Sequence, residues 1–386
     1  MANTVLNHPS HPRAKATLTL IVILWAGLLI LLPKAPAAGF TLMSESGEIE
    51  TGRKLDEEIG SKMGFYSEPN LQTYISEVVR RLVRGGSPRS FEYQVKIVDI
   101  PEENAFATVG GFVYITRGML SQLNSETELA GVMAHEISHI SHRHLAKQQT
   151  RALAYQVIGM GAMALGATLG NADNNLGMAP VGVSAALATV LSNYNQEAEL
   201  EADESGLLMM AQAGYDPRGL VSFLRGLRAR ERLTGLGYHG MLATHPETAE
   251  RIAKAETMSQ LLASQRSFAE AGEETYKQHL EGLPYGNRHD RLRIGLYRTE
   301  PGDSLASIRQ KVMAPDEKAW EVASLNRMRS SDSIQPSMLL KIVLPDGRAV
   351  ALPQRRLDLS RDRPLAPPPP PRPMPPQRSR VPYPRN

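Results

Sequence analysis

The stretch His135-Glu136-Ile137-Ser138-His139 indicates both the chemistry and the fold of this chain. On a helix, residues four apart share a face, so the two imidazoles can reach one metal ion. Glu136 lies one step round the helix, where its carboxylate can take a proton from an attacking water molecule. Neutral nitrogen ligands, an open coordination position and a general base are the parts of a zinc hydrolase. The alternative is a chance match on an ordinary helix, since the pattern is short.

The flanking residues predict a long, buried helix. Ser125 is typical of an N-cap, and Glu128 stands at the capping-box position three residues later. Apolar residues then recur at three- and four-residue spacing, which predicts a stripe facing the core. They are Leu129, Val132, Met133, Ile137 and Ile140. His142 and Leu145 stand where the metzincin pattern has Gly and His, which excludes that subclass.

A catalytic zinc site needs a third protein ligand. Beyond Ile140, the next glutamate is Glu197, which opens a short acidic segment. Helical spacing places Glu199 and Asp203 on a face that continues into apolar residues, and it places Glu197, Glu201 and Glu204 on a face expected to be solvated. We predict Glu199 as the third ligand and Asp203 as the carboxylate that orients a ligand histidine. The alternative is an exposed acidic helix without a metal.

This arrangement resembles the Ste24/HtpX-type family of zinc metallopeptidases, which are gluzincins. Further motifs extend the resemblance over roughly residues 45 to 260. They are Asn104-Ala105-Phe106-Ala107, Gly110-Gly111-Phe112-Val113-Tyr114-Ile115, Gly214-Tyr215-Asp216-Pro217, Thr244-His245-Pro246-Glu247-Thr248 and Arg251-Ile252. Gln196 and Thr108-Val109 depart from the family pattern, which puts substrate contacts in doubt more than metal binding.

The resemblance implies an α+β, mostly helical domain with a small sheet, and one Zn²⁺ per chain held by His135, His139 and Glu199. It also implies a polypeptide substrate that adds as a strand along Asn104, Ala105, Phe106 and Ala107. Periplasmic members of the family act in outer-membrane protein quality control, so misassembled envelope proteins are the implied substrates. Two other classes remain as alternatives: a chaperone-like scaffold with little proteolysis, and a structural protein that binds peptidoglycan.

His245 lies in a segment that resembles the family's histidine–proline segment. Its position before Pro246 disfavours helix and predicts a loop. A loop histidine near the metal has two candidate roles: stabilising the oxyanion, or occupying the fourth zinc position and keeping the enzyme latent. We prefer latency because an unrestrained envelope protease would threaten its neighbours.

The N-terminus predicts secretion. Arg13 and Lys15 precede an apolar run over residues 16–32, followed by small residues around Ala37 and Ala38. This is typical of a cleaved signal peptide, and therefore of a periplasmic protein; an inner-membrane anchor formed by residues 16–32 is the alternative. The chain has no cysteine, so no disulfide framework exists, and its formal net charge of +3 does not suggest a nucleic-acid partner.

A second apolar segment, residues 152–169, contains several glycines. It predicts a core helix or, with residues 181–191, a hairpin over the active site rather than a membrane span. Contact between residues 152–191 and a membrane surface is a further alternative.

The C-terminal part changes character. Strand, helix, helix and strand are predicted from residue 292 to 344, and with "PGDSL" at 301–305 this order resembles a LysM domain, which would bind peptidoglycan by analogy. A degenerate module that packs on the protease or binds protein is equally compatible with this order. The predicted divisions are a signal peptide at 1–38, a protease domain at 39–260, a helical linker at 261–290, a LysM-like domain at 291–346 and a disordered Pro/Arg-rich tail at 347–386.

Overall fold

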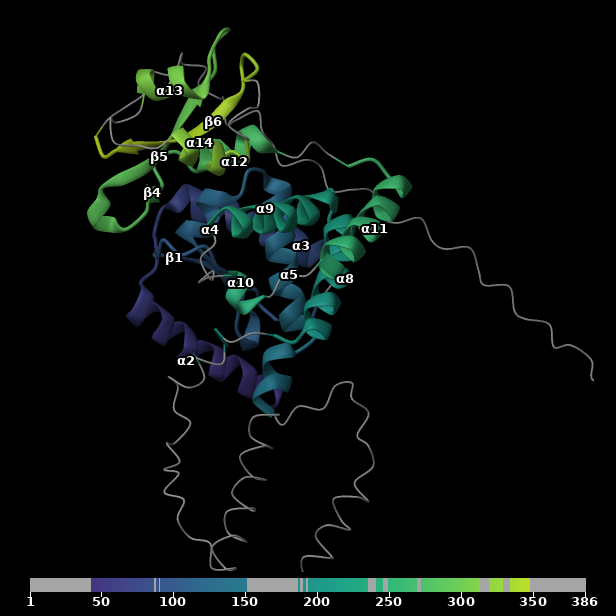
Figure 1. The fold of residues 1–386 in the computed structure, drawn as a ribbon. Coiled ribbons are helices and arrows are strands. Elements are labelled where there is room, and N and C mark those ends of the chain that lie inside the picture. Colours follow the sequence, from purple (N-terminus) through teal and green to yellow (C-terminus); the bar gives the residue numbers. More distant parts are fainter. Residues whose placement is uncertain are drawn as a thin grey trace, which may run out of the picture.

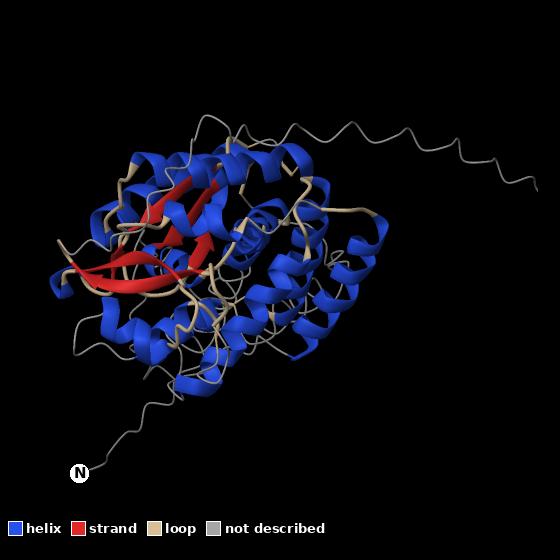
Figure 2. Ribbon diagram, turned by 90° about the horizontal axis from the view of Figure 1, so that it is seen from above, coloured by secondary structure: helices blue, strands red, loops and turns tan. Residues whose placement is uncertain are grey.

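A computed structural model describes residues 43–86, 88–89, 91–150, 187, 190–191, 194–234, 241–245, 249–268, 272–312, 319–328 and 334–347. Helices dominate this part of the chain and two small sheets accompany them, as Figures 1 and 2 show, so the predicted mostly helical α+β class is confirmed. Within these ranges, no helix is both long and apolar enough to cross a membrane. The signal-peptide region, nearly all of the 152–191 segment and the C-terminal tail lie outside them.

The helix that carries the metal motif, α5 (Glu126–Ser141), lies at the centre of the fold (Figure 1). Ser125 caps it by accepting from the backbone N–H of Glu128, as predicted. The Glu128 carboxylate reaches one residue further back than a capping box requires and accepts from the N–H of Asn124. Residues 127–140 are all buried, so α5 is covered on every side rather than along one stripe.

Among the described helices, α8 (Gln196–Gln212), α9 (Arg218–Thr234) and α3 (Pro69–Gly86) make the most extensive contacts with α5. Glycines allow the closest approaches. A Cβ on Gly206 of α8 would lie 3.2 Å from the backbone nitrogen of His135, and one on Gly219 of α9 would lie 2.5 Å from the carbonyl oxygen of Thr127. The backbones of α8 and α5 therefore come close enough for short acidic side chains on α8 to reach the histidines.

The first sheet has the strand order β1 (Gln94–Val98), β3 (Phe112–Thr116), β2 (Ala105–Ala107). The pair β1–β3 is parallel and β2–β3 is antiparallel. Val109–Gly111, directly before β3, forms a 3₁₀ turn, η1. Gly110 and Gly111 have φ values of 80° and 97°, a conformation that favours glycine over residues with a side chain.

The other described elements surround this core. They are α2 (Glu45–Met63), α4 (Arg117–Gln122), α10 (Met241–Thr244), α11 (Ala249–Gln265), α12 (Glu273–His279) and η2 (Arg288–Asp290). The predicted linker at 261–290 is therefore not uniformly helical, since it contains α12, η2 and the short strand β4 (Pro284–Tyr285).

The C-terminal module has the predicted order of strand, two helices and strand: β5 (Leu292–Arg298), α13 (Leu305–Val312), α14 (Ala319–Leu325) and β6 (Leu339–Pro345). Its antiparallel sheet has the order β4-β5-β6. Both faces of β6 are buried: Leu340, Ile342 and Leu344 face the module's own helices, and Val343 belongs to the main core. Packing on the protease thus uses one face of this sheet, while glycan binding by residues 291–346 stays a prediction.

Candidate metal centre

The candidate site lies where α5, α8 and the residue after α10 meet. His135 and His139 stand one turn apart on α5, Glu199 comes from the first turn of α8, and His245 directly follows α10. All four side chains are buried, and one potential ligand atom of each lies within 4.8 Å of the others. The structure therefore brings together the three predicted ligands and His245, from segments up to 110 residues apart.

The distances between these atoms fit a zinc ion. His135 Nε2 lies 3.0 Å from His139 Nε2, and the Glu199 carboxylate oxygens lie 3.5 Å from each of these nitrogens. Four ligand atoms at about 2.0–2.1 Å from a tetrahedral zinc ion would be separated by about 3.3–3.4 Å. Two imidazoles and a carboxylate are also the donor set of many catalytic zinc sites, so the residues present fit the metal.

The electrostatics of the cluster favour a bound cation. Burial opposes ionisation of Glu199, but the imidazoles of His245 and His135 outweigh it and hold its pKa well below the usual range. Burial also lowers the pKa of His135, yet the Asp203 and Glu199 carboxylates reverse the effect and raise it to about 10. Burial and the neighbouring His135 lower the pKa of His139, which keeps that ring neutral and able to offer a lone pair.

Glu136 is placed as a general base should be. Its side chain is fully buried, and neither carboxylate oxygen has a hydrogen-bond partner among the described residues. His245 Nε2 lies 3.6 Å from Glu136 Oε1. Burial raises the pKa of the Glu136 carboxyl group, and His245 and His135 only partly oppose this. Burying a carboxylate without hydrogen-bond partners costs free energy. Such groups occur mainly where they take part in binding or catalysis.

His245 reaches the cluster through its other ring nitrogen. Its Nδ1 lies 3.3 Å from His135 Nε2 and 2.9 Å from Glu199 Oε1, so it occupies a fourth corner beside the three predicted ligands. Hydrogen bonds anchor the segment that carries it: the N–H of Met241 donates to the carbonyl of Glu103, and the Thr244 hydroxyl donates to Asn104 Oδ1 at 3.4 Å. The same contacts join this segment to the start of β2.

The predicted outer carboxylate, Asp203, lies one turn after Glu199 on α8. Its Oδ1 is 2.9 Å from His135 Nδ1, the nitrogen on the far side of the ring from the cluster. Arg251, which lies on α11, is buried against Asp203 and also approaches Glu199 Oε2 at 2.7 Å. The sequence marked Arg251 only as part of a motif; its ionic contacts depend on the packing of α11 on α8.

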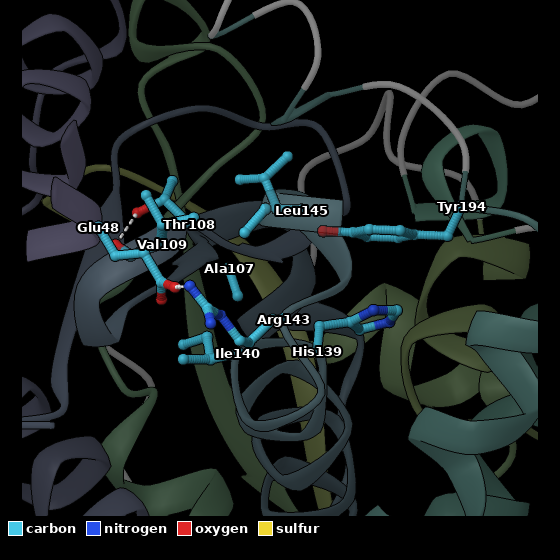
Figure 3. A pocket seen from close by; sticks show the side chains of 10 residues that line it. Glu48, Ala107, Thr108, Val109, His139, Ile140, Arg143, Leu145 and Tyr194 are labelled. Carbon is cyan, nitrogen blue, oxygen red and sulfur yellow. Dashed lines mark hydrogen bonds and ion pairs between the residues drawn. The ribbon is translucent and has the colours of Figure 1, made fainter. Parts of the chain in front are cut away.

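A small hollow adjoins His139 (Figure 3). Tyr194 stacks on the His139 ring with centroids 4.1 Å apart, and Ala107 at the end of β2 lines the same hollow. On the opposite side, Glu48 and Arg143 form an ion pair. Tyr194 was not predicted from the sequence as part of the site. The sequence feature that could have indicated it is its position just before the acidic helix.

The predicted substrate-binding strand, residues 104–107, is buried. The side chains of Asn104, Ala105, Phe106 and Ala107 are all buried, and Phe106 stacks on Tyr114. The exposed fractions of these residues include the backbone, so the edge of β2 is also covered in this structure, and substrate pairing along residues 104–107 stays a prediction. In the part of the chain that the structure describes, β2 has β3 as its single strand neighbour.

Comparison with known proteins agrees with this geometry. The model of peptidase family M48 matches residues 67–259, half of the chain, and the chain belongs to this family of zinc metallopeptidases. The beta-barrel assembly-enhancing protease of Escherichia coli O157:H7 is 31% identical over 224 residues, which cover 57% of this chain and 45% of that protein. The mitochondrial metalloendopeptidase OMA1 of Schizosaccharomyces pombe is 29% identical over 186 residues, 47% of this chain and 51% of that protein. The matches thus span about half the length of these relatives.

Proposed function

We propose that this chain is a zinc-dependent endopeptidase of the bacterial cell envelope that degrades misfolded or misassembled outer-membrane proteins. The observation that carries the proposal is the buried Glu136 carboxylate, which has no hydrogen-bond partner among the described residues, beside three convergent ligands. A scaffold without catalysis would gain nothing from that costly arrangement. The envelope substrate is suggested by the name of the bacterial relatives and by the family resemblance.

The residues divide the chemistry between them. A bound zinc ion would polarise the scissile carbonyl and acidify the attacking water. His135, His139 and Glu199 would hold it, and Asp203 would fix the His135 ring by accepting from Nδ1–H. Glu136 would take a proton from the attacking water on a carboxylate oxygen and return it to the leaving amine nitrogen. Its raised pKa brings it closer to neutrality, where such a proton exchange is easiest.

The edge of β2 is the proposed substrate platform; because its residues are buried in this structure, the segment that covers the edge would have to move aside first. An extended polypeptide can pair with an exposed strand edge through main-chain hydrogen bonds, which suits substrates of varied sequence. Ala107 lines the hollow beside His139, so a peptide laid along β2 would pass close to the metal ligands. An unfolded polypeptide is therefore a better substrate class than a folded one.

We also propose that His245 keeps the enzyme latent by acting as a fourth ligand. The position of its Nδ1 in the ligand cluster supports this role over oxyanion stabilisation. A catalytic zinc ion needs an open coordination position, so His245 would have to move away before turnover. Residues 241–245 are hydrogen-bonded to Glu103 and Asn104, which directly precede β2. A movement of His245 would therefore be coupled to β2, the proposed substrate-binding strand.

The decisive experiment compares the purified full-length protein with Glu136→Gln on an unfolded outer-membrane protein. The wild type should cleave it, and Glu136→Gln should be inactive while still holding zinc, because glutamine cannot accept the proton. Glu197→Gln, an exposed acidic residue on α8, is the matched control and should cleave like the wild type. Equal proteolysis by the wild type and Glu136→Gln would refute the proposal.

Location is a separate part of the proposal. N-terminal sequencing of the protein from an envelope fraction should find a start near Ala38 or Gly39, where the predicted signal peptide ends. A start at Ala2 in a membrane-bound protein would instead identify residues 16–32 as an anchor.

A further inference from the structure

The second ligand histidine, His139, has an outer partner of its own. His144 lies three residues beyond the end of α5, and its Nδ1 is 2.8 Å from His139 Nδ1. On the other side of the same ring, His144 Nε2 is 2.9 Å from Glu201 Oε2 on α8. His144 is buried, whereas the Glu201 side chain is 45% exposed. A continuous row of contacts thus runs from solvent through Glu201 and His144 to the metal ligand.

A backbone turn places His144 in this row. Arg143 adopts a left-handed conformation with φ of 57°, unusual for a residue with a side chain, and the chain turns there directly after α5. His144 is thereby brought back to within hydrogen-bond distance of His139. His142 lies on the other side of Glu201, with Nδ1 3.1 Å from Oε1, so the same carboxylate is held by two rings.

Only one arrangement of protons satisfies the row when His139 binds a metal. His139 Nε2 faces His135 Nε2 and Glu199, so it must be the ligand atom, and the ring proton must then lie on Nδ1. That N–H can donate to His144 only if His144 Nδ1 is the unprotonated nitrogen. The His144 proton then lies on Nε2 and points at Glu201, whose carboxylate can only accept. The row therefore selects the tautomer of His139 that coordinates through Nε2.

The first ligand histidine is held in a parallel way, by Asp203 from the same helix. Glu199, Glu201 and Asp203 alternate along one turn of α8: one reaches the cluster directly, one acts through His144, and one acts on His135. The prediction that Glu201 lies on a solvated face agrees with its exposure, but it missed the contact to His144. That contact depends on how α8 packs beside the end of α5.

We infer that His144 and Glu201 are positioning residues that orient His139 and fix its tautomer for zinc binding. The inference rests on the proposed zinc site and deepens it. Such partners of ligand histidines raise ligand basicity and hold the ring, and their loss typically weakens metal affinity by about 10–100-fold. Neither residue belongs to the ligand cluster itself, and His144 contacts it through His139, so the first effect of changing them is on zinc affinity.

The test measures zinc dissociation constants of the full-length protein by competition with a chelator. His144→Leu should weaken zinc binding by about 10–100-fold, and Glu201→Gln by about tenfold or less. The double variant should bind like His144→Leu alone, because Glu201 acts through His144 and the two effects are then not additive. His144→Asn should restore much of the affinity, since its amide oxygen can accept from His139 Nδ1–H. Glu204→Gln, an exposed carboxylate on the same helix, is the control and should match the wild type.

Each outcome has a definite meaning. Unchanged zinc affinity in His144→Leu would overturn the inference, and full additivity in the double variant would overturn the role of Glu201 through His144. Should His144→Leu fail to fold, as judged by melting of the metal-free protein, the comparison of Glu201→Gln with Glu204→Gln decides, because both alter only exposed side chains. A wild type that binds no zinc would instead refute the proposed function.

Discussion

The guanidinium of Arg251 holds the carboxylate of Asp203 with two parallel hydrogen bonds, from Nε to Oδ2 at 2.7 Å and from Nη2 to Oδ1 at 2.8 Å. Both side chains are buried. Asp203 Oδ1 also accepts from His135 Nδ1. Arg251 therefore orients the Asp203 carboxylate, which in turn orients the ring of the predicted ligand His135. The metal centre is thus supported from α11, an element more than a hundred residues after the zinc motif.

Arg251→Met should lower the free energy of unfolding by about 3–5 kcal/mol, because it leaves the Asp203 carboxylate buried without its cationic partner. Arg251→Lys should fall between Arg251→Met and the wild type, since a point charge cannot make two parallel bonds. Urea unfolding of the metal-free protein measures both. Arg218→Met is the control: the Arg218–Asp216 pair has similar bonds, but the arginine is exposed, and a cost of about 1 kcal/mol or less is expected.

Zinc content should separate ligands from the base. His135→Ala, His139→Ala and Glu199→Ala should each lose the metal, whereas Glu136→Gln should retain one zinc per chain because its carboxylate is not a ligand. Asp203→Ala should weaken zinc binding by about 10–100-fold without abolishing it. Elemental analysis after gel filtration makes the comparison, with Glu197→Ala as a control on the same helix. Full zinc in Glu199→Ala would remove Glu199 from the site.

His245→Ala should increase proteolysis of an unfolded substrate, because it frees the fourth coordination position. The expected increase is seen as a higher initial cleavage rate at saturating zinc. Oxyanion stabilisation predicts the opposite, a loss of about a hundredfold or more. His289→Ala alters a histidine that is 82% exposed and should leave the rate unchanged. An unchanged rate in His245→Ala would exclude both roles.

Lys341→Met should weaken the packing of the C-terminal module on the protease domain. The buried Lys341 amino group on β6 donates to the carbonyls of Ser121 and Leu123 at 2.6 and 2.7 Å. Methionine would fill the same space but leave both carbonyls without a partner, at a cost of about 2–3 kcal/mol. Thermal melting of the full chain and protease sensitivity of the module report the change. Lys311→Met, in the exposed ion pairs of α13, should have a much smaller effect.

The stability of the module should fall in acid. Burial opposes ionisation of Asp303, but hydrogen bonds from the Glu300 N–H, Lys311 and Tyr297 outweigh it and lower its pKa to about 2. Because the folded pKa lies below the unfolded value of about 3.9, this contribution is complete above pH 4 and is lost as the pH falls toward 2. With allowance for solvent screening it amounts to about 1 kcal/mol.

Asp303→Asn tests this directly. The variant should be less stable than the wild type at pH 6, and the difference should shrink as the pH falls to 3, measured by urea unfolding. Asp346→Asn, an exposed carboxylate of the same module, is the control. A difference between Asp303→Asn and the wild type that is independent of pH would contradict the prediction.

Local geometry explains what the sequence by itself determined. Residues four apart on a helix share a face, so the joint approach of His135 and His139 to one point required no knowledge of the rest of the fold. The same periodicity selected Glu199 and Asp203 from a crowded acidic segment. The strand predicted to open the C-terminal module at residue 292 likewise begins where β5 begins, at Leu292. Each of these features depends on the backbone conformation of fewer than about ten consecutive residues.

Tertiary packing decided the rest. Periodicity tells which face of a helix is buried, but not which distant side chain that face will meet. The arrival of His245 at the cluster, the pairing of Arg251 with Asp203, and the row from Glu201 through His144 to His139 all depend on the placement of separate elements against α5 and α8. Gly206 suits the close spacing of those two helices, since a Cβ there would lie 3.2 Å from the His135 backbone nitrogen, a tight contact. Side-chain contacts at 3 Å are decided by such backbone separations, which no local pattern encodes.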